Sequence, residues 1–185
     1  MSTKQLEKST TEIQIPKDVK ANLKGSMLEI IGPLGKVYKN FKKIPVLIEI
    51  NDDKILLKKT GKRKKYHAIL NTSKSLIQTL CIGVVDGFTI KMKIVYSHFP
   101  ITVKAEEKRV LIENFQGERA PRICMIRGST KVTVNGDDVI LTGPVLTDIS
   151  QTAANIQLKS KVKNKDHRVF LDGIYRYSKT KGIEK

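Results

Sequence analysis

The 185-residue chain contains little of what secreted domains and membrane proteins need. It has two cysteines, Cys81 and Cys124, each inside an apolar run, and two cysteines make no disulfide framework. Tryptophan is absent, and aromatic residues make up only 5% of the chain. No apolar stretch approaches the roughly 20 residues of a membrane span, and residues 1–12 lack the apolar core of a secretory signal. We therefore expect buried thiols in a reducing compartment, no membrane partner and a cytosolic protein.

Motifs for catalysis and for metal binding are missing as well. The segment GPLGK (32–36) has too few residues between its glycines for a phosphate-binding loop, and Val37 follows its lysine where Ser or Thr is required. The acidic pairs Asp52-Asp53 and 137–138 occupy equivalent hairpin turns, where turn chemistry explains them. The histidines show no metal-ligand spacing with one another or with the cysteines. We expect no catalytic residue, no metal, no cofactor and no small-molecule substrate.

Positive charge is what the chain has in excess. Lysine and arginine total 35 against 18 acidic residues, which gives a net charge of +17. Charge of this size opposes compact folding through self-repulsion, so an anionic partner is expected. Residues 1–100 hold 19 basic side chains and residues 101–185 hold 16, so both halves should face the anion.

An internal repeat divides the chain into two similar modules of about 85 residues each. Three blocks recur in the same order: 15–21 as 99–105 and 48–57 as 132–141, both shifted by 84, and 85–90 as 171–176, shifted by 86. The expected domains are a flexible N-terminal extension (1–12), a first module (13–97), a second module (98–177) and a polar basic tail (178–185).

Each module is predicted to contain short strands followed by one helix. Alternating apolar and polar residues around Asn, Asp and Gly turns indicate hairpins. After each hairpin the apolar residues follow helical spacing, within 66–84 and within 147–160. Thr147 or Asp148 is the expected N-cap of the second helix, and Gly83 the expected end of the first. The predicted fold class is α+β, with two repeated modules that each pack one helix on an antiparallel sheet.

A row of lysines precedes an apolar segment near the end of the chain. This lysine comb consists of Lys159, Lys161, Lys163 and Lys165. In an extended chain these side chains point the same way, roughly 6.5–7 Å apart, which is close to the phosphate spacing of an RNA strand. Arg168 can fork two phosphate oxygens, and Asp166 can cap a short turn. If the segment were helical instead, the lysines would scatter around the axis.

A second basic segment, KKTGKRKK (58–65), lies between an expected strand and an expected helix. Its candidate RNA-binding residues are Lys62, Arg63, Lys64 and Lys65. Gly61 has no side chain at the bend, so the loop can approach a phosphate backbone closely. The alternative is a solvated loop that binds nothing.

The aromatic residues do not follow the pattern of proteins that read single-stranded RNA. Proteins that read single-stranded RNA expose aromatic side chains on which bases stack. Here the aromatic residues lie mostly in expected strands beside apolar neighbours. We therefore expect them to pack in the cores, and we expect recognition to run through the backbone and shape of structured RNA.

Several segments resemble one known family. VKNKDHRVFLDGIY (162–175), VYSHFPITV (95–103) and NFQGE (114–118) resemble the eukaryotic and archaeal form of the universal large-subunit ribosomal protein L-six family, called L-nine in eukaryotes. IPKDVKANLKGSMLEIIGPLG (15–35) and TAANIQ (152–157) fit the same pattern. The resemblance implies binding to 28S-type ribosomal RNA near the sarcin–ricin loop and the stalk base, with neighbouring large-subunit proteins as further partners. It also implies the cytosolic large subunit as location, with nucleolar assembly if the source is eukaryotic.

The resemblance also implies that the second module (98–177) supplies the main RNA contacts, and it implies roles for particular residues. The implied RNA contacts are Lys161, Lys163, Asn164, Lys165, Arg168, Asp172, Gly173 and Tyr175. The implied junction between the modules is Tyr96, His98 and Phe99. Two segments depart from the family pattern: Lys59-Thr60 replaces a tryptophan pair before the glycine of the basic loop, and CMIRGSTK (124–131) lacks a proline before its glycine.

We therefore expect a structural ribosomal protein without catalytic activity, which stabilises folded ribosomal RNA by neutralising phosphates. One alternative is an RNA-modifying enzyme with duplicated domains, which would need a cofactor pocket. A second is a basic RNA-binding adaptor outside the ribosome, or an adaptor at anionic membranes, which would need an amphipathic basic helix.

Overall fold

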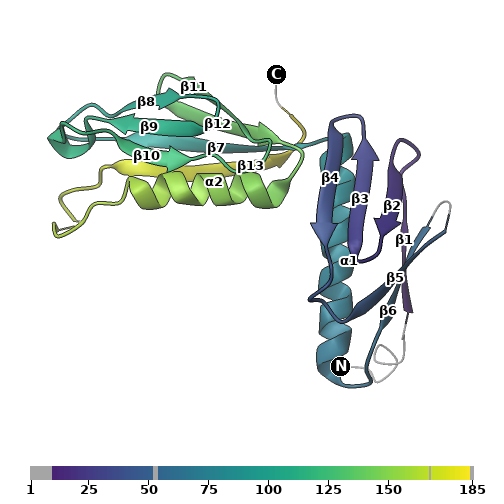
Figure 1. Ribbon diagram of the computed structural model, residues 1–185. Coiled ribbons are helices and arrows are strands. Elements are labelled where there is room, and N and C mark those ends of the chain that lie inside the picture. The colour runs from purple at the N-terminus through teal and green to yellow at the C-terminus, as the bar shows by residue number, and fades with distance from the viewer. Residues whose placement is uncertain (1–9, 52–53, 167, 184–185) are drawn as a thin grey trace. The chain divides into compact units, whose positions relative to one another are not determined.

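The chain forms two compact units in its computed structural model, one ending at Val85 and one beginning at Asp86. The structure describes residues 10–51, 54–166 and 168–183. Within these residues each unit contains two antiparallel sheets and one long α-helix (Figure 1). The predicted α+β class is confirmed.

The first unit consists of short strands followed by one helix. Its elements are β1 (Thr10–Gln14), β2 (Lys20–Lys24), β3 (Met27–Gly32), β4 (Gly35–Asn40), β5 (Val46–Asn51), β6 (Lys54–Lys59) and α1 (Lys64–Val85). One three-stranded sheet has the order β1-β6-β5 and the other the order β2-β3-β4. All neighbouring strands are antiparallel, as the hairpin turns predict.

α1 packs against both sheets and closes the core of the first unit. Leu70, Ile77 and Val84 of α1 are fully buried, at a spacing that puts them on one side of a helix. Ile30 of β3 and Leu57 of β6 are fully buried with them. Each fully buried aliphatic side chain contributes about 1.5–3 kcal/mol, so this contact accounts for much of the stability of the unit.

α1 is longer than predicted. It continues through Gly83 and ends at Val85, and Gly87 then adopts the left-handed φ of 75° that favours glycine after a helix. By length and composition alone α1 could cross a membrane, contrary to the expectation that no stretch could. The core helix of a globular protein passes the same test, and α1 buries its apolar side against two sheets.

The second unit has one strand more than the first in the described residues. Its elements are β7 (Phe88–Val95), β8 (Thr102–Ala105), β9 (Arg109–Glu113), the 3-10 turn η2 (Phe115–Gly117), β10 (Arg122–Met125), β11 (Lys131–Asn135), β12 (Asp138–Gly143), α2 (Leu146–Lys159) and β13 (Gly173–Lys181). The strand orders are β10-β9-β8 and β11-β12-β7-β13. All neighbouring pairs are again antiparallel.

α2 packs against strands of both sheets in the second unit, β10 of one sheet and β7, β12 and β13 of the other. Ile149 and Ile156 of α2 and Ile90 of β7 are buried at this contact. The helix begins after Val145, which caps it without a side-chain hydrogen bond, so the predicted N-cap at Thr147 or Asp148 is wrong. Both residues lie inside the first turn, where the negative carboxylate of Asp148 interacts favourably with the positive end of the helix dipole.

Three segments lie differently from the predicted boundaries. The repeat predicts that the strand after the first Asp-Gly pair, Phe88–Val95, belongs to the first module, but it pairs with β12 and β13 and belongs to the second unit. Residues 10–12 belong to β1 and not to a flexible extension, whose residues 1–9 lie outside the described chain. Residues 178–181 belong to β13, where pairing with β7 satisfies their backbone groups.

Candidate nucleic-acid interface

The lysine comb begins at the last residue of α2 and continues in non-helical chain. Ser160 and Val162 are buried, with 1% and 3% of their surface exposed, whereas Lys159, Lys161 and Lys163 are exposed. Residues two apart thus share a side, as the alternation predicts for an extended segment. The helical alternative does not apply beyond Lys159, because α2 ends there.

Asn164 ends the regular row. Its φ of 57° lies in the left-handed region, which asparagine tolerates better than most residues. The Asp166 carboxylate accepts a hydrogen bond of 2.9 Å from the backbone N–H of Arg168, and the N–H of Phe170 donates to the carbonyl of Asp166, which forms the predicted short turn. The Lys165 ammonium lies 4.6 Å from the centre of the Phe170 ring. The exposed cations are therefore a row of three lysines followed by Lys165 and Arg168 on a separate turn.

A buried hydroxyl fixes the start of the comb. Ser160 Oγ accepts a hydrogen bond of 3.0 Å from the backbone N–H of Ile174 in β13. The same hydroxyl lies 3.0 Å from the carbonyl oxygen of Ile156 in α2, to which it donates. Both isoleucines are fully buried, so the hydroxyl ties the end of the helix to the start of the strand in the core.

The side chain of Arg122 in β10 binds the backbone of the comb. Its Nη1 donates to the carbonyl oxygens of Lys159 at 2.6 Å and Lys161 at 3.3 Å. Its Nε and Nη2 donate to the Glu118 carboxylate at 2.7 Å and 2.6 Å, and its guanidinium lies 4.1 Å from the centre of the Phe115 ring. This two-point pairing holds the arginine in one position, and it lowers the pKa of Glu118.

Sequence reasoning missed Arg122. It lies four residues after Glu118, but the segment between them has no periodicity that indicates a pair. Charge counting also treats it like any other arginine. Only the fold brings its guanidinium to the end of α2, 37 residues further along the chain.

Asp172 and Gly173 do not face the surface. Asp172 is 2% exposed, and its carboxylate accepts a hydrogen bond of 2.7 Å from the backbone N–H of Ser97. Gly173 is also buried, and a Cβ there would lie 2.8 Å from the Tyr175 ring. Both residues shape the backbone between the comb and β13, and their implied role as RNA contacts stays a prediction. Tyr175 itself is exposed, and its hydroxyl donates to the carbonyl of Leu171 at 3.2 Å.

Tyr96, His98 and Phe99 follow β7 in the second unit. The ring of His98 lies 5.5 Å from that of Phe170, centre to centre. The ring of Phe99 packs beside Gly117, where an added Cβ would lie 3.4 Å from it. The His98 contact supports the turn that carries Lys165 and Arg168, and the role of the three residues as a module junction stays a prediction.

The second basic segment lies at the start of α1. Lys62, Arg63, Lys64 and Lys65 are all exposed. Lys64 and Lys65 belong to the first turn of α1, which contains no acidic residue, so their charges oppose the positive end of the helix dipole. A bound anion would remove this repulsion. Gly61 lies under the ring of Tyr66, where a Cβ would come within 2.5 Å of the ring.

Comparison with known proteins gives the family. A sequence model of ribosomal protein L6 matches residues 99–173. The large ribosomal subunit protein uL6 of Methanosarcina mazei is 42% identical, over 88% of this chain and 93% of the relative. The uL6 protein of Thermoplasma volcanium is 44% identical, over 90% and 94%, and that of Methanobrevibacter smithii is 41% identical, over 91% and 94%.

The chain belongs to the ribosomal protein L6 family. The segment that the L6 model matches contains Arg122 and the whole lysine comb, whereas the basic segment 62–65 lies outside it. The relatives named above are archaeal, and the expectation of a eukaryotic form stays a prediction.

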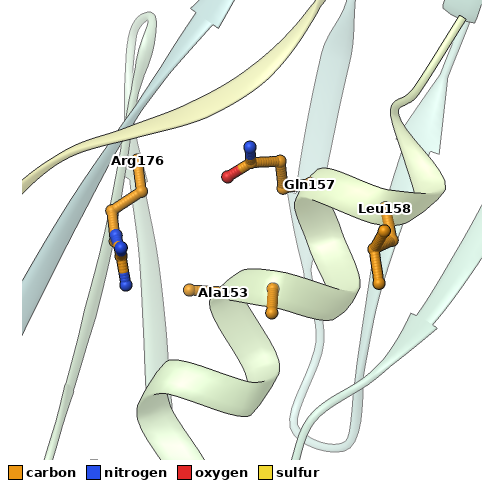
Figure 2. Close-up of a pocket in the computed structure, with 5 residues that line it drawn as sticks. Ala153, Gln157, Leu158 and Arg176 are labelled. Carbon is orange, nitrogen blue, oxygen red and sulfur yellow. The ribbon is translucent and has the colours of Figure 1, made fainter.

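In the described part of this L6 family member, the other notable features are a pocket and two free cysteines. A pocket of about 290 Å³ lies between α2 and β13, lined by Ala153, Ala154, Gln157, Leu158 and Arg176 (Figure 2). Arg176 is the one charged group in this lining, and no acid or nucleophile accompanies it. Burial raises the pKa of the two free cysteines, which keeps them as thiols. Among the described residues, no three His, Cys, Asp or Glu side chains gather as a metal site.

Proposed function

We propose that the chain is a structural constituent of the large ribosomal subunit that binds and stabilises 28S-type ribosomal RNA near the sarcin–ricin loop and the stalk base. Its uL6 relatives are named as large ribosomal subunit proteins, and the family role is structural and not enzymatic. The observation that carries the proposal is a row of exposed lysines whose backbone is fixed by buried groups. The proposed location is the cytosolic ribosome, with neighbouring subunit proteins as partners and nucleolar assembly if the source is eukaryotic.

The proposed RNA contacts fall into two groups. The first is the exposed cationic end of the second unit. It consists of Lys159, Lys161, Lys163, Asn164, Lys165 and Arg168, with Tyr175 beside them. The second group is Lys62, Arg63, Lys64 and Lys65 at the start of α1. Asp172 and Gly173 belong to the first group as well, and since both are buried we propose that they act through the backbone between the comb and β13.

We also infer that the two units are repeats of one ancestral module. In each, two strands of one sheet form a hairpin that leads directly into the helix: β5 and β6 before α1, and β11 and β12 before α2. A third strand then pairs with the second strand of the hairpin, β1 in the first unit and β7 in the second. β7 follows α1 in the chain but takes the place of β1, so it serves as the first strand of the second repeat.

Neutralising the comb tests the function. We expect Lys161→Ala, Lys163→Ala, Lys165→Ala and Arg168→Ala together to lower affinity for an rRNA fragment of the sarcin–ricin and stalk-base region about a hundredfold or more near 0.1 M salt. The slope of log K against log salt should fall in magnitude by about 3–4, since each phosphate contact releases counterions. Thermal unfolding should be nearly unchanged, because all four side chains are exposed.

A control variant of equal charge separates position from net charge. Lys54, Lys58, Lys104 and Arg109 are each paired with a glutamate, so changing all four to Ala also removes four positive charges. We expect this variant to bind the fragment with nearly the wild-type salt slope and to enter large subunits in cells. An equal loss in both variants would refute the comb as the RNA site.

A further inference from the structure

The four-stranded sheet of the second unit has one face packed against α2 and one face that carries exposed tyrosines. Tyr175 is 43% exposed and Tyr177 is 57% exposed, contrary to the expectation that aromatic residues pack in the cores. Tyr175 stands opposite Lys93 of β7, next to Ile94, whose buried side chain points to the helix side. Since neighbouring residues of a strand alternate between faces, Tyr175 and Lys93 lie on the face away from α2.

The Tyr175 ring is held in place. Its hydroxyl donates to the carbonyl of Leu171, and the ring lies against the backbone of Gly173, where a Cβ would come within 2.8 Å of it. One side of the ring is therefore packed on main chain while much of the residue stays exposed. A ring fixed in this way loses little entropy when a ligand stacks on it.

The Tyr177 ring is held by a different contact on the same face. Tyr177 is the extra residue where the register of β13 shifts against β7 between Arg176 and Ser178. Its hydroxyl lies 3.4 Å from Oδ1 of Asp138 in β12, and the Lys93 ammonium lies 3.4 Å from the same oxygen. Because β7 lies between β13 and β12 in the sheet, the phenol side chain extends across β7.

The charges beside the two rings are balanced. Lys93 and Asp138 pair with each other, and this pair lies beside the hydroxyl of Tyr177. Nucleobases, which are uncharged and planar, suit such a surface better than phosphates do. The exposed lysines of the comb lie in the segment that leads directly into β13.

We propose that Tyr175 and Tyr177 form a stacking surface for unpaired nucleotides of RNA, whose phosphates continue onto the lysine comb. This proposal rests on the proposed function and extends it, because it adds stacking on bases to the neutralisation of phosphates. Base–aromatic stacking tolerates any sequence, so the ligand is defined as an unpaired RNA segment and not by its bases.

A single tryptophan reports on stacking directly. The protein has no tryptophan, so the fluorescence of a Tyr177→Trp variant comes from that position alone. We expect unstructured oligouridylate RNA to quench this fluorescence, and we expect heparin, a polyanion without bases, to bind the cations without quenching it. The matched control is Tyr38→Trp in β4, since Tyr38 is also 57% exposed but stands opposite the Glu29 carboxylate. We expect RNA not to quench the control.

A second pair of variants measures the affinity. Tyr177→Ala should weaken binding of the oligonucleotide about 5- to 100-fold, and Tyr177→Phe should stay within about twofold of wild type because the ring remains. The salt slope should be unchanged in both variants, since no phosphate contact is lost.

Several outcomes would overturn the proposal. One is that heparin quenches the Tyr177→Trp fluorescence as strongly as RNA does. Another is that RNA binds the Tyr177→Trp variant without quenching it. The third is that Tyr177→Ala and Tyr177→Phe bind the oligonucleotide with equal affinity. Failed entry of Tyr177→Ala into large subunits at unchanged RNA affinity would show that the face docks a protein instead. If wild-type protein bound no RNA at all, the proposed function itself would fail, and that result is distinct from the others.

Discussion

Two regions of the molecule, the β1-β6-β5 sheet of the first unit and the lysine comb of the second, carry their positive charges in different ways. In the β1-β6-β5 sheet of the first unit, the ammonium of Lys54 lies 3.1 Å from the Glu12 carboxylate, and that of Lys58 lies 2.7 Å from the Glu49 carboxylate. In the second unit, no lysine of the comb has an ion-pair partner within the part of the chain that the structure describes. The first arrangement compensates charge within the protein, and the second leaves it for a ligand.

This difference shows why net charge alone does not locate an RNA site. A lysine already paired on the surface must give up its partner before it can meet a phosphate, and such pairs are worth only about 0–1 kcal/mol. An unpaired lysine binds a phosphate at no such cost and releases counterions when it does so. The protein adds order to the comb by fixing its backbone and not its side chains.

Among single substitutions, Arg122→Lys should lower the RNA affinity of the comb the most. Lysine keeps the charge but cannot bridge Glu118 and two carbonyl oxygens at once. Ordering the backbone of about one comb residue would then fall on the binding step, at about 1–2 kcal/mol, which is about a tenfold loss of affinity for the rRNA fragment. The free energy of unfolding should also fall by about 1–3 kcal/mol. Filter binding and urea unfolding measure the two effects.

The salt dependence distinguishes positioning from contact. If Arg122 only positions the comb, the salt slope of the Arg122→Lys variant should match that of wild type, and the substitution should have little effect once the comb has been neutralised. A smaller slope, or full additivity with the comb variant, would mean that Arg122 touches phosphate itself.

Ser160→Ala tests through the free energy of unfolding whether buried groups fix the start of the comb. The substitution leaves the buried N–H of Ile174 without its acceptor, so we expect unfolding to become easier by about 1–3 kcal/mol. Ser75 of α1 is the matched control, since its hydroxyl is exposed and donates to the carbonyl of Asn71 within its own helix. Ser75→Ala should change the free energy of unfolding by less than about 0.5 kcal/mol. If Ser160→Ala and Ser75→Ala lowered the free energy of unfolding equally in urea, the hydrogen bond from Ile174 to Ser160 would not stabilise the fold.

The local features of the site could be predicted from the sequence. Alternation of lysines with Ser160 and Val162 indicated which side chains face outward, and Asp166 marked the turn that follows. Both features depend on residues near one another in the chain. The left-handed Asn164 interrupts the row, and alternation alone cannot predict a single residue with positive φ.

Features that depend on distant residues could not be predicted. The β7 strand follows the first helix and reads like the end of the first module, yet its pairing partners are β12 and β13. Arg122 gains its role only because β10 packs beside α2. The exposure of Tyr177 depends on which face of the sheet α2 covers, and the sequence of β13 alone does not show this. In each case the outcome depends on contacts between residues far apart in the chain, which the local sequence pattern does not specify.

Glu118 offers a smaller test by titration. Its hydrogen bonds from Arg122 lower the pKa of the carboxyl below the ordinary range, and we expect this pKa to rise again in the Arg122→Lys variant. Because the folded pKa is below the unfolded one, the pair stabilises the protein above about pH 4.3 and the gain is lost as pH falls through the folded pKa. Carbon-detected NMR titration measures both proteins. An unchanged pKa in the variant would mean that Arg122 does not hold the carboxylate in solution.

The smallest effect is expected where charge is already compensated. Lys54→Ala and Lys58→Ala together remove two exposed pairs of the first unit, in which the lysine side chains are 49% and 42% exposed. Water and salt screen such pairs, so the free energy of unfolding should change by less than about 1 kcal/mol. The affinity for the rRNA fragment should stay within about twofold, because neither lysine releases counterions to the RNA. A tenfold loss would mean that the RNA displaces the glutamates, and the contrast between compensated and uncompensated lysines would then not determine where the protein binds.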